Sequence, residues 1–199
     1  TMTNPTRTAT VTRSTSETDI ACTLTLDGTG ASTISTGLGF LDHMLTALTK
    51  HSRFDLELAC TGDLHIDDHH TAEDCALALG QALDQALGDR AGIARFAHAY
   101  APLDESLART VIDLSGRPFA SVDIQFVREM LGDIATENIT HFVQSLATAA
   151  RTTLHVDLIR GDNDHHKAEA CFKALAIALR QAVAIDDTAG MPSTKGSLT

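Results

Sequence analysis

Two segments of the chain carry histidine and glutamate at spacings that are typical of metal ligands on a helix. The first reads DHHTAEDC over residues 68–75 and the second reads DHHKAEAC over residues 164–171. On a helix, the first histidine and the glutamate lie four residues apart and the second histidine and the glutamate three apart, so either pair can share a face. Imidazole and carboxylate together are good ligands for divalent transition-metal ions. The pattern therefore predicts metal-dependent chemistry.

These segments belong to a longer internal repeat. Twelve of the twenty residues in 68–87 are identical to the residues 96 positions later. A second pair of segments, 40–51 and 139–151, precedes them in the same order and aligns His43 with His141. The chain is therefore predicted to be a tandem duplication with roughly ninety residues in each half.

The repeat defines eight candidate ligands, enough for two metal ions with about four protein ligands each. Adjacent histidines on a helix diverge by about 100°, so the two members of a pair can serve different ions. An isolated pair could be no more than a solvated helix start, but its duplication with glutamate at the same spacing favours a metal centre. Such ligands suit octahedral Mn²⁺ or Fe²⁺, and Zn²⁺ would compete on affinity. The candidates are His43, His69, His70, Glu73, His141, His165, His166 and Glu169.

Hydrophobic periodicity predicts the elements that position these residues. Helices are predicted over 40–51, 71–87, 140–151 and 166–184, and strands over 8–13, 19–25, 54–60, 107–113, 118–125 and 153–159. Each half then contains strands, a helix, a strand and a second helix. The expected fold class is α+β, a duplicated unit in which helices cover a sheet.

The expected organisation of the chain has four parts. Residues 1–7 are a disordered N-terminus, 8–95 the first half, 96–187 the second half and 188–199 a C-terminal tail. The join between the halves is expected near residues 92–102. The tail has the glycine, proline and serine content of a linker.

Composition argues against several classes of function. The net charge of -11 disfavours nucleic-acid binding, which needs clustered basic residues. No apolar run reaches the roughly eighteen residues of a membrane span, and the N-terminal residues lack the apolar stretch of a secretory signal. Four cysteines without CxxC spacing indicate neither a zinc knuckle nor a redox pair. We expect a reduced, cytoplasmic protein with no nucleic-acid or membrane partner.

Further motifs accompany the histidine-rich segments. They are FLDHML at 40–45, PLDE at 102–105, SGRPF at 115–119, FKA at 172–174 and PSTKG at 192–196. Along nearly its whole length the chain thus resembles the imidazoleglycerol-phosphate dehydratase family of histidine biosynthesis. The resemblance implies a ribosomal-S5-domain-2-like fold, two Mn²⁺ per active site and a homo-oligomer, a 24-mer built from trimers. Gly39 and Ser52 depart from the family pattern, and neither is a candidate ligand.

The resemblance also implies which residues contact substrate. They are Glu17, His51, Arg95, Arg117, Lys173, Ser193 and Lys195, together with the metal ligands His43, His69, Glu73 and His165. The four basic residues would bind a phosphate group within an otherwise acidic protein, and Ser193 would add a hydroxyl donor. The tail 188–199 is then expected to be a substrate-binding segment.

The implied reaction is the dehydration of imidazole glycerol phosphate to imidazole acetol phosphate. It must break a C–H bond that no carbonyl group activates. Two metal ions on the two ring nitrogens would hold an imidazolate, and loss of the hydroxyl group would give a diazafulvene-like intermediate. A carboxylate base can then remove the neighbouring proton. Glu17 is the first candidate because metal-bound carboxylates are less basic, and Glu73 and Glu169 are the alternatives.

Two other functions stay open on the residues alone. A dinuclear metallohydrolase would use a metal-bound water and would hydrolyse phosphate esters. A metal-storing cage would hold many ions in each subunit, whereas the dehydratase needs about two. Metal content and the product formed from imidazole glycerol phosphate distinguish the three.

Overall fold

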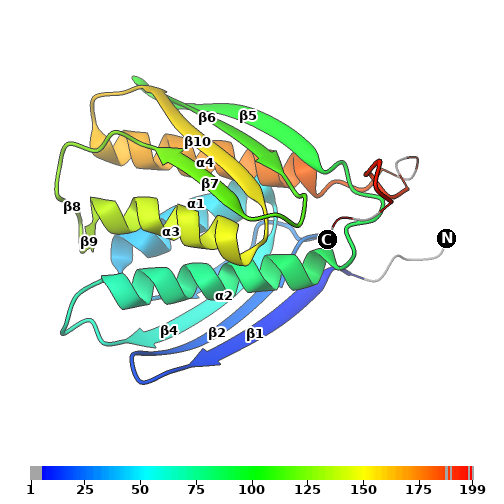
Figure 1. The fold of residues 1–199 in the computed structure, drawn as a ribbon. Coiled ribbons are helices and arrows are strands. Elements are labelled where there is room, and N and C mark those ends of the chain that lie inside the picture. Colours follow the sequence, from blue (N-terminus) through cyan, green and yellow to red (C-terminus); the bar gives the residue numbers. More distant parts are fainter. Residues whose placement is uncertain (1–5, 187, 189, 197, 199) are drawn as a thin grey trace.

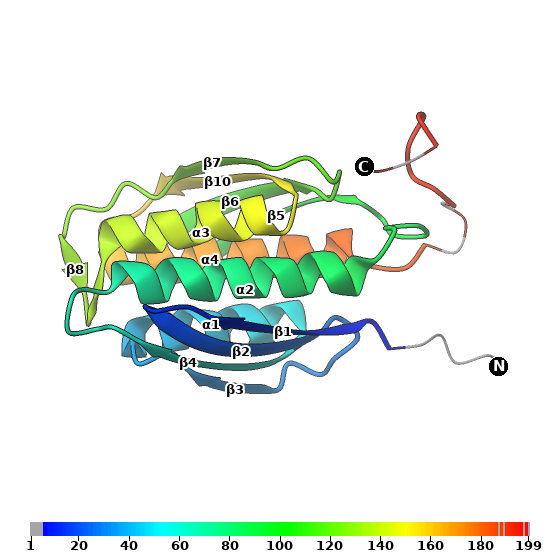
Figure 2. The same cartoon turned by 60° about the horizontal axis from the view of Figure 1, so that its bottom comes forward.

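Two four-stranded sheets enclose a layer of four helices in the computed structural model, which describes residues 6–186, 188, 190–196 and 198. Figure 1 and Figure 2 show this sheet–helix–sheet arrangement from two directions. All four helices begin at the same end of the molecule, and the C-terminal segment lies at the other end (Figure 1). The helix starts are therefore neighbours in space although they are far apart in the sequence.

The first sheet and its helices come from the N-terminal half of the chain. The elements are β1 (Thr8–Ser14), β2 (Thr18–Thr25), β3 (Ser32–Ser35), α1 (Gly39–Ser52), β4 (Asp55–Gly62) and α2 (His69–Leu87). The strand order is β1-β2-β4-β3, with β3 parallel to β4 and the other pairs antiparallel. Alternation along β2 buries Ile20, Cys22 and Leu24 on the helix side and leaves Asp19 and Ala21 outside.

The second sheet repeats this topology. Its elements are β5 (Phe96–Leu103), β6 (Ser106–Asp113), β7 (Phe119–Asp123), α3 (Thr136–Ala149), β10 (Thr153–Arg160) and α4 (Asp164–Ala182), with a short ribbon of β8 (Met130–Leu131) and β9 (Ile134–Ala135) before α3. The order is β5-β6-β10-β7, and β7 is parallel to β10 as β3 is to β4. The predicted α+β fold with two similar sheet-plus-helix halves is confirmed.

The helices of the two halves pack crosswise. The most extensive helix–helix contacts are those of α1 with α4 and of α2 with α3, and each of them joins the first half to the second. Leu48, Leu79, Leu146 and Leu179, one from each helix, meet in this layer, and all four side chains are buried. Burial of apolar surface between the halves therefore holds the helix starts in register.

Secondary structure differs from the sequence prediction in two respects. No strand is predicted at β3, β5, β8 or β9, and β5 runs through the stretch expected to join the halves. In β5 the inward residues are alanines and the outward ones include Phe96 and Tyr100, so the usual pattern of apolar inside and polar outside is absent. Helices α2 and α4 also begin two residues earlier than predicted, at His69 and Asp164, and α3 begins four residues earlier, at Thr136.

Both terminal segments are described in part. Residues 1–5 of the expected disordered N-terminus lie outside the described residues, as do 187, 189, 197 and 199. Arg7 pairs with Asp27 at 2.6 Å and donates a hydrogen bond to the carbonyl oxygen of Val183 at 2.7 Å, which links the two ends of the chain. Within the described residues, none of the helices combines the length and apolar character that a membrane crossing requires.

A close approach between α2 and α3 gives a testable consequence. A Cβ atom at Gly80 would lie 2.6 Å from the Cβ of Ala149 and 2.7 Å from the carbonyl oxygen of Leu146. Gly80→Ala is expected to cost about 1–2 kcal/mol of stability, because overpacking outweighs the gain of roughly 1 kcal/mol in helix propensity. Gln81→Ala, on the exposed side of the same helix, is the control and should be nearly neutral. Thermal unfolding measures both, and an unchanged midpoint for Gly80→Ala would contradict the prediction.

Candidate active site

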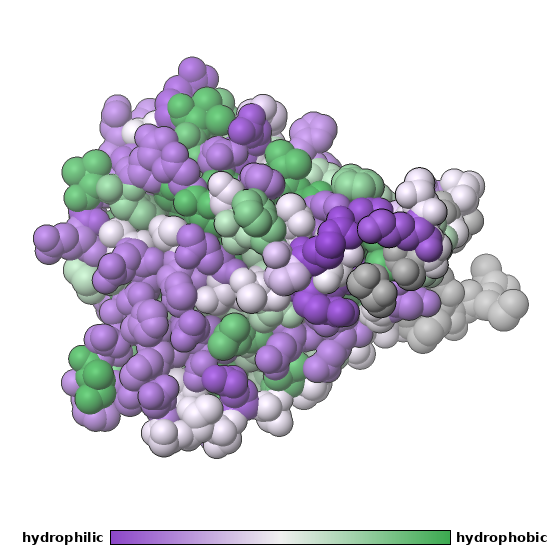
Figure 3. All heavy atoms as spheres, viewed as in Figure 1, coloured by the Kyte–Doolittle hydropathy of each residue, from purple (hydrophilic) through white to green (hydrophobic). Residues whose placement is uncertain are grey.

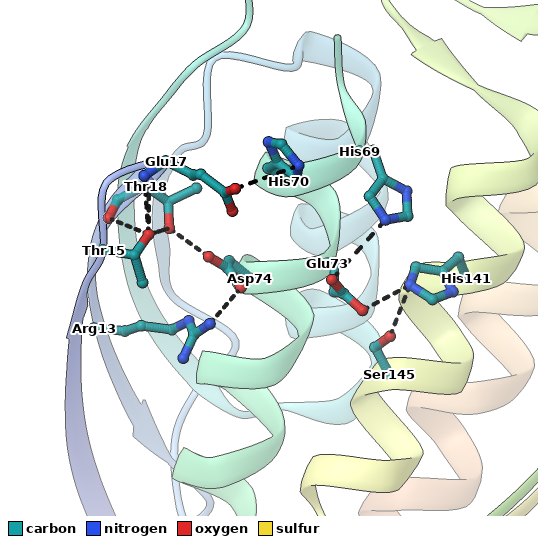
Figure 4. A network of polar contacts seen from close by, with 10 residues as sticks. All are labelled: Arg13, Thr15, Glu17, Thr18, His69, His70, Glu73, Asp74, His141 and Ser145. Carbon is teal, nitrogen blue, oxygen red and sulfur yellow. Dashed lines mark hydrogen bonds and ion pairs between the residues drawn. The ribbon is translucent and has the colours of Figure 1, made fainter. Parts of the chain in front are cut away.

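Three predicted ligands form a cluster where α2 meets α3. His69 and Glu73 lie one turn apart on α2, and His141 faces them from α3 (Figure 4). The Nε2 atom of His141 is 2.9 Å from Oε1 of Glu73, and Nε2 of His69 is 3.9 Å from Oε2 of the same carboxylate. The ligand atoms all lie within 4.8 Å of one another, which is compact enough for one metal ion.

A second cluster, related to the first by the internal repeat, lies where α1 meets α4. Oε2 of Glu169 is 3.3 Å from Nε2 of His43 and 3.4 Å from Nε2 of His165. The start of α1 is tied to the second half by Asp133, whose carboxylate accepts hydrogen bonds from the backbone N–H groups of Gly39 and Phe40. This contact helps hold His43 beside α4.

Each cluster therefore combines residues from both halves. His141 of the second half joins the His69–Glu73 pair of the first, and His43 of the first half joins the His165–Glu169 pair of the second. The crosswise packing of the four helices produces this exchange. Neither half contains a complete cluster by itself.

The donor atoms of the clusters fit a divalent transition metal. Two imidazoles and one carboxylate form an open set of ligands that suits Mn²⁺, Fe²⁺ or Zn²⁺ and leaves positions for further ligands. Nδ1 of His69 donates a hydrogen bond to Oδ1 of Asn138 at 2.9 Å, which leaves Nε2 free to bind a cation. Outer partners of this kind orient metal-binding histidines in many proteins.

The other two predicted ligands, His70 and His166, lie outside both clusters. Nδ1 of His70 donates to Oδ2 of Asp63 at 3.0 Å, and Nδ1 of His166 donates to Oε2 of Glu105 at 2.7 Å. These hydrogen bonds raise the pKa of both imidazoles. Each hydrogen bond also fixes the orientation of its ring through Nδ1. Metal-binding histidines are commonly oriented in this way when Nε2 is the metal ligand.

Two of the predicted substrate contacts, Glu17 and Lys173, lie beside the candidate ligands. The carboxylate of Glu17, in the turn between β1 and β2, is half exposed and is 3.7 Å from Nε2 of His70. Nζ of Lys173 is 2.8 Å from Oε1 of Glu169. His51 lies in the last turn of α1, about two helical turns beyond His43, and its pKa is lowered by partial burial and by the nearby charge of Lys173.

The remaining predicted contacts line a separate cavity of about 610 Å³. Its walls include Arg95, Arg117, Ser193 and Lys195. The guanidinium of Arg95 pairs with Asp113 at 2.7 Å, donates to the carbonyl oxygen of Pro192 at 2.6 Å and lies 4.3 Å from the ring centre of Phe96. The cavity thus combines three basic side chains and a hydroxyl group, a composition that suits an anion.

This cavity lies far from the clusters within one chain. The clusters are at the starts of the helices, and the C-terminal segment that forms one wall is at the opposite end (Figure 1). Strongly hydrophilic side chains gather beside that segment on the face drawn in Figure 3. A single chain therefore does not bring the basic cavity and the candidate metal ligands together.

A duplicated α+β scaffold with two clusters of histidine and glutamate defines a candidate two-metal enzyme. The family model described as imidazoleglycerol-phosphate dehydratase matches residues 36–179, and the chain belongs to this family of hydro-lyases. It is 63% identical over 192 residues to the enzyme of that name from Phytophthora nicotianae, which covers 96% of this chain but only 42% of that protein. It is 56% identical over 194 residues to the Zymomonas mobilis enzyme, which covers 96% of this chain and 99% of that protein.

Solved structures agree with this assignment. The dehydratase from Staphylococcus aureus superposes with a TM-score of 0.81 at 38% identity, covering 89% of this chain and 99% of that chain. The enzyme from Pyrococcus furiosus, in complex with (S)-C348, has a TM-score of 0.81 at 36% identity and covers 94% of this chain and 100% of that chain. The fold is thus shared with enzymes of known structure.

Four residues whose side chains hydrogen-bond to the imidazole rings of the candidate histidines are missing from the sequence prediction: Asp63, Glu105, Asn138 and Ser145. Two weak signals were present. Glu105 belongs to the PLDE motif, and Asn138 precedes His141 by three residues, one turn of a helix. Asp63 follows β4 in a turn, and only the folded chain brings it to His70.

Proposed function

We propose that the chain catalyses the dehydration of imidazole glycerol phosphate to imidazole acetol phosphate in histidine biosynthesis, with the cytoplasm as the expected compartment. The observation that carries this proposal is the pair of equivalent two-histidine, one-glutamate clusters in a member of this family. The test is incubation of the purified protein with Mn²⁺ and imidazole glycerol phosphate. We expect the enol–ketone absorbance of the product, whereas release of inorganic phosphate would favour a hydrolase and would contradict the proposal.

Mn²⁺ is the proposed ion, with two per active site. When bound, two ions would supply Lewis acidity to the imidazole ring of the substrate, which is the chemistry that the proposed route through an imidazolate and a diazafulvene-like intermediate requires. His69, Glu73 and His141 would hold one ion, and His43, His165 and Glu169 the other. His70 and His166 lie outside both groups, and we propose that they complete clusters of a neighbouring subunit.

Glu17 is the proposed base, which takes the proton from the carbon next to the departing hydroxyl group. Its half-exposed carboxylate lies next to His70 and belongs to neither cluster. Glu73 and Glu169 are the alternatives, but each faces two histidines of its own cluster. Although burial opposes it, the charges of Lys173 and His43 hold the pKa of Glu169 below its usual value, which makes this carboxylate a weaker base.

An assembly of many chains is the proposed state, a 24-mer built from trimers. Its support is that the basic cavity and the clusters lie at opposite ends of one chain, so a second chain is needed to join them. The second sheet also exposes apolar rings, with Phe96 60%, Tyr100 55% and Phe119 55% accessible. Apolar side chains over this sheet are visible in Figure 3, and such patches commonly mark subunit contacts.

Binding of the substrate phosphate by the tail predicts a selective kinetic effect. Lys195→Ala is expected to raise KM about tenfold and to change kcat little, because a contact distant from the reacting carbon contributes mainly uniform binding. Lys195→Arg keeps the positive charge and should retain most of the affinity. Steady-state kinetics measure both variants, and equal KM values for Lys195→Ala and the parent would remove this residue from the phosphate site.

Metal removal is expected to change the size of the particle. Without cations, the proposed links between the clusters of one chain and His70 and His166 of a neighbouring chain would be lost. Chelation should therefore convert a very large particle into a smaller one, such as a trimer, and added Mn²⁺ should restore it. Light scattering on chelated and reconstituted samples is the test. An unchanged mass after verified metal removal would show that protein–protein packing alone holds the assembly.

A further inference from the structure

A buried carboxylate on α2 holds the turn that carries Glu17. Asp74 follows His70 by one helical turn and is only 4% exposed. Its Oδ2 atom accepts a hydrogen bond from the hydroxyl of Thr18 at 2.5 Å, and its Oδ1 atom is 2.9 Å from Nη2 of Arg13 (Figure 4). Both ends of the β1–β2 turn are thereby attached to α2.

The turn itself is fixed through its backbone. The hydroxyl oxygen of Thr15 accepts hydrogen bonds from the N–H groups of Glu17 at 3.1 Å and Thr18 at 3.0 Å. The carbonyl oxygen of Glu17 accepts from the N–H group of Asp63 at 3.0 Å. Asp63 in turn accepts from His70, so this contact also leads back to α2. The backbone of Glu17 is held on both sides, and its carboxylate is left beside His70.

The second half of the chain contains an instructive counterpart. Glu105 lies in the turn between β5 and β6, as Glu17 lies between β1 and β2, and each faces the second histidine of its HHxxE segment. The carboxylate of Glu105 accepts hydrogen bonds from His166, from the N–H group of Asn163 at 2.9 Å and from the hydroxyl of Ser106 at 3.1 Å. These contacts engage both oxygens of the carboxylate, Oε1 with Asn163 and Ser106 and Oε2 with His166. A carboxylate engaged in this way is a poor base.

The position that corresponds to Asp74 in the second copy is Ala170, 96 residues later. The second turn is therefore anchored by the glutamate carboxylate itself, whereas the first is anchored by Asp74 and Thr18. The difference leaves the Glu17 carboxylate available for proton transfer. Asp74, which belongs to neither candidate metal cluster, thus occurs in the copy of the repeat that also carries Glu17, the proposed base.

We propose that Asp74 is a positioning residue for Glu17: through Thr18 it holds the β1–β2 turn against α2, so that the Glu17 carboxylate stays beside His70. This inference rests on the proposed function, in which Glu17 removes a proton. Proton transfer needs the base within hydrogen-bond reach of the reacting C–H group. A displacement of about 1 Å can cost roughly a hundredfold in rate.

The experiment uses Thr18, because Asp74→Ala would leave the charge of Arg13 without its partner and risk misfolding. Thr18→Val removes the hydroxyl group at nearly constant volume, and Thr18→Ser is the matched variant that keeps it. We expect Thr18→Val to lower kcat by about tenfold to a hundredfold with KM and bound metal unchanged. Thr18→Ser should stay close to the parent.

A double-mutant cycle separates positioning from a general structural effect. If Thr18 and Asp74 act through Glu17, Thr18→Val should cause no further loss in a Glu17→Gln background. Amide hydrogen exchange at Glu17 and Thr18 gives a readout that does not depend on activity, and it should accelerate in Thr18→Val but not in Thr18→Ser.

Three outcomes would overturn the inference: an equal loss of kcat in both backgrounds, loss of metal in Thr18→Val, or unchanged exchange in the turn. Failure of the proposed function has different signatures. A parent protein without dehydration activity would refute that function while exchange still reports whether the turn is held. Parental turnover in Glu17→Gln would refute the role of Glu17 as base, and with it the positioning role of Asp74.

Discussion

Replacing Glu73 or Glu169 by glutamine is expected to remove one bound metal ion from each chain and to lower turnover more than a hundredfold. Each glutamate is the one carboxylate of its three-residue cluster, so glutamine removes the negative charge that offsets the cation. Even outer-shell partners of metal ligands are worth about 10- to 100-fold in affinity or activity, and a direct ligand should exceed that. Elemental analysis and steady-state kinetics of both variants measure the effect.

Because each cluster combines residues from both halves, pairs of substitutions also test which ligands share an ion. His43→Ala and Glu169→Gln should remove the same ion, so the double variant should lose no more metal than either single one. His43→Ala combined with Glu73→Gln should lose both ions. Glu57→Gln, on the exposed side of β4, is the charge-matched control and should keep two. Full metal content in Glu73→Gln or Glu169→Gln would rule out these clusters as the binding sites.

Glu17→Gln is expected to keep both metal ions and to lose about a hundredfold or more in kcat. Glutamine is similar in shape but cannot accept the proton, and general base catalysis contributes about 10²–10⁴-fold to such reactions. Because Glu17 belongs to neither cluster, metal binding should be unaffected. Single-turnover measurements at saturating Mn²⁺ isolate the chemical step.

Glu105→Gln, in the counterpart turn of the second half, is the matched control for Glu17→Gln. Glu105 holds His166 through Nδ1, so its loss should weaken metal binding by about 10- to 100-fold. Excess Mn²⁺ should then restore most of the turnover in Glu105→Gln, whereas it should restore none in Glu17→Gln. Near-parental turnover in Glu17→Gln would transfer the role of base to Glu73 or Glu169.

Several features of this protein are local, and the sequence predicts them. The i, i+4 spacing of His69 and Glu73 places both side chains on one face of α2 whatever lies around the helix, because a helix repeats every 3.6 residues. His165 and Glu169 have the same spacing in the second copy of the repeat, so the same argument applies to them. Identity between the copies also predicted two similar halves, and alternation predicted the long strands such as β2 and β6. These signals depend on residues that are neighbours along the chain.

Other features depend on which helices pack together. His43 and His141 have equivalent places in the repeat, so the pattern allows either one to join either HHxxE segment. The choice is made by the contacts of α1 with α4 and of α2 with α3, which bury apolar side chains across the two halves. The partners Asp63, Asn138 and Glu105 reach the histidines in the same way, from segments that meet only after folding. Ligand spacing is a property of one helix, whereas ligand grouping is a property of the packed layer of helices, and that is why the tertiary structure alone assigns His43 to Glu169 and His141 to Glu73.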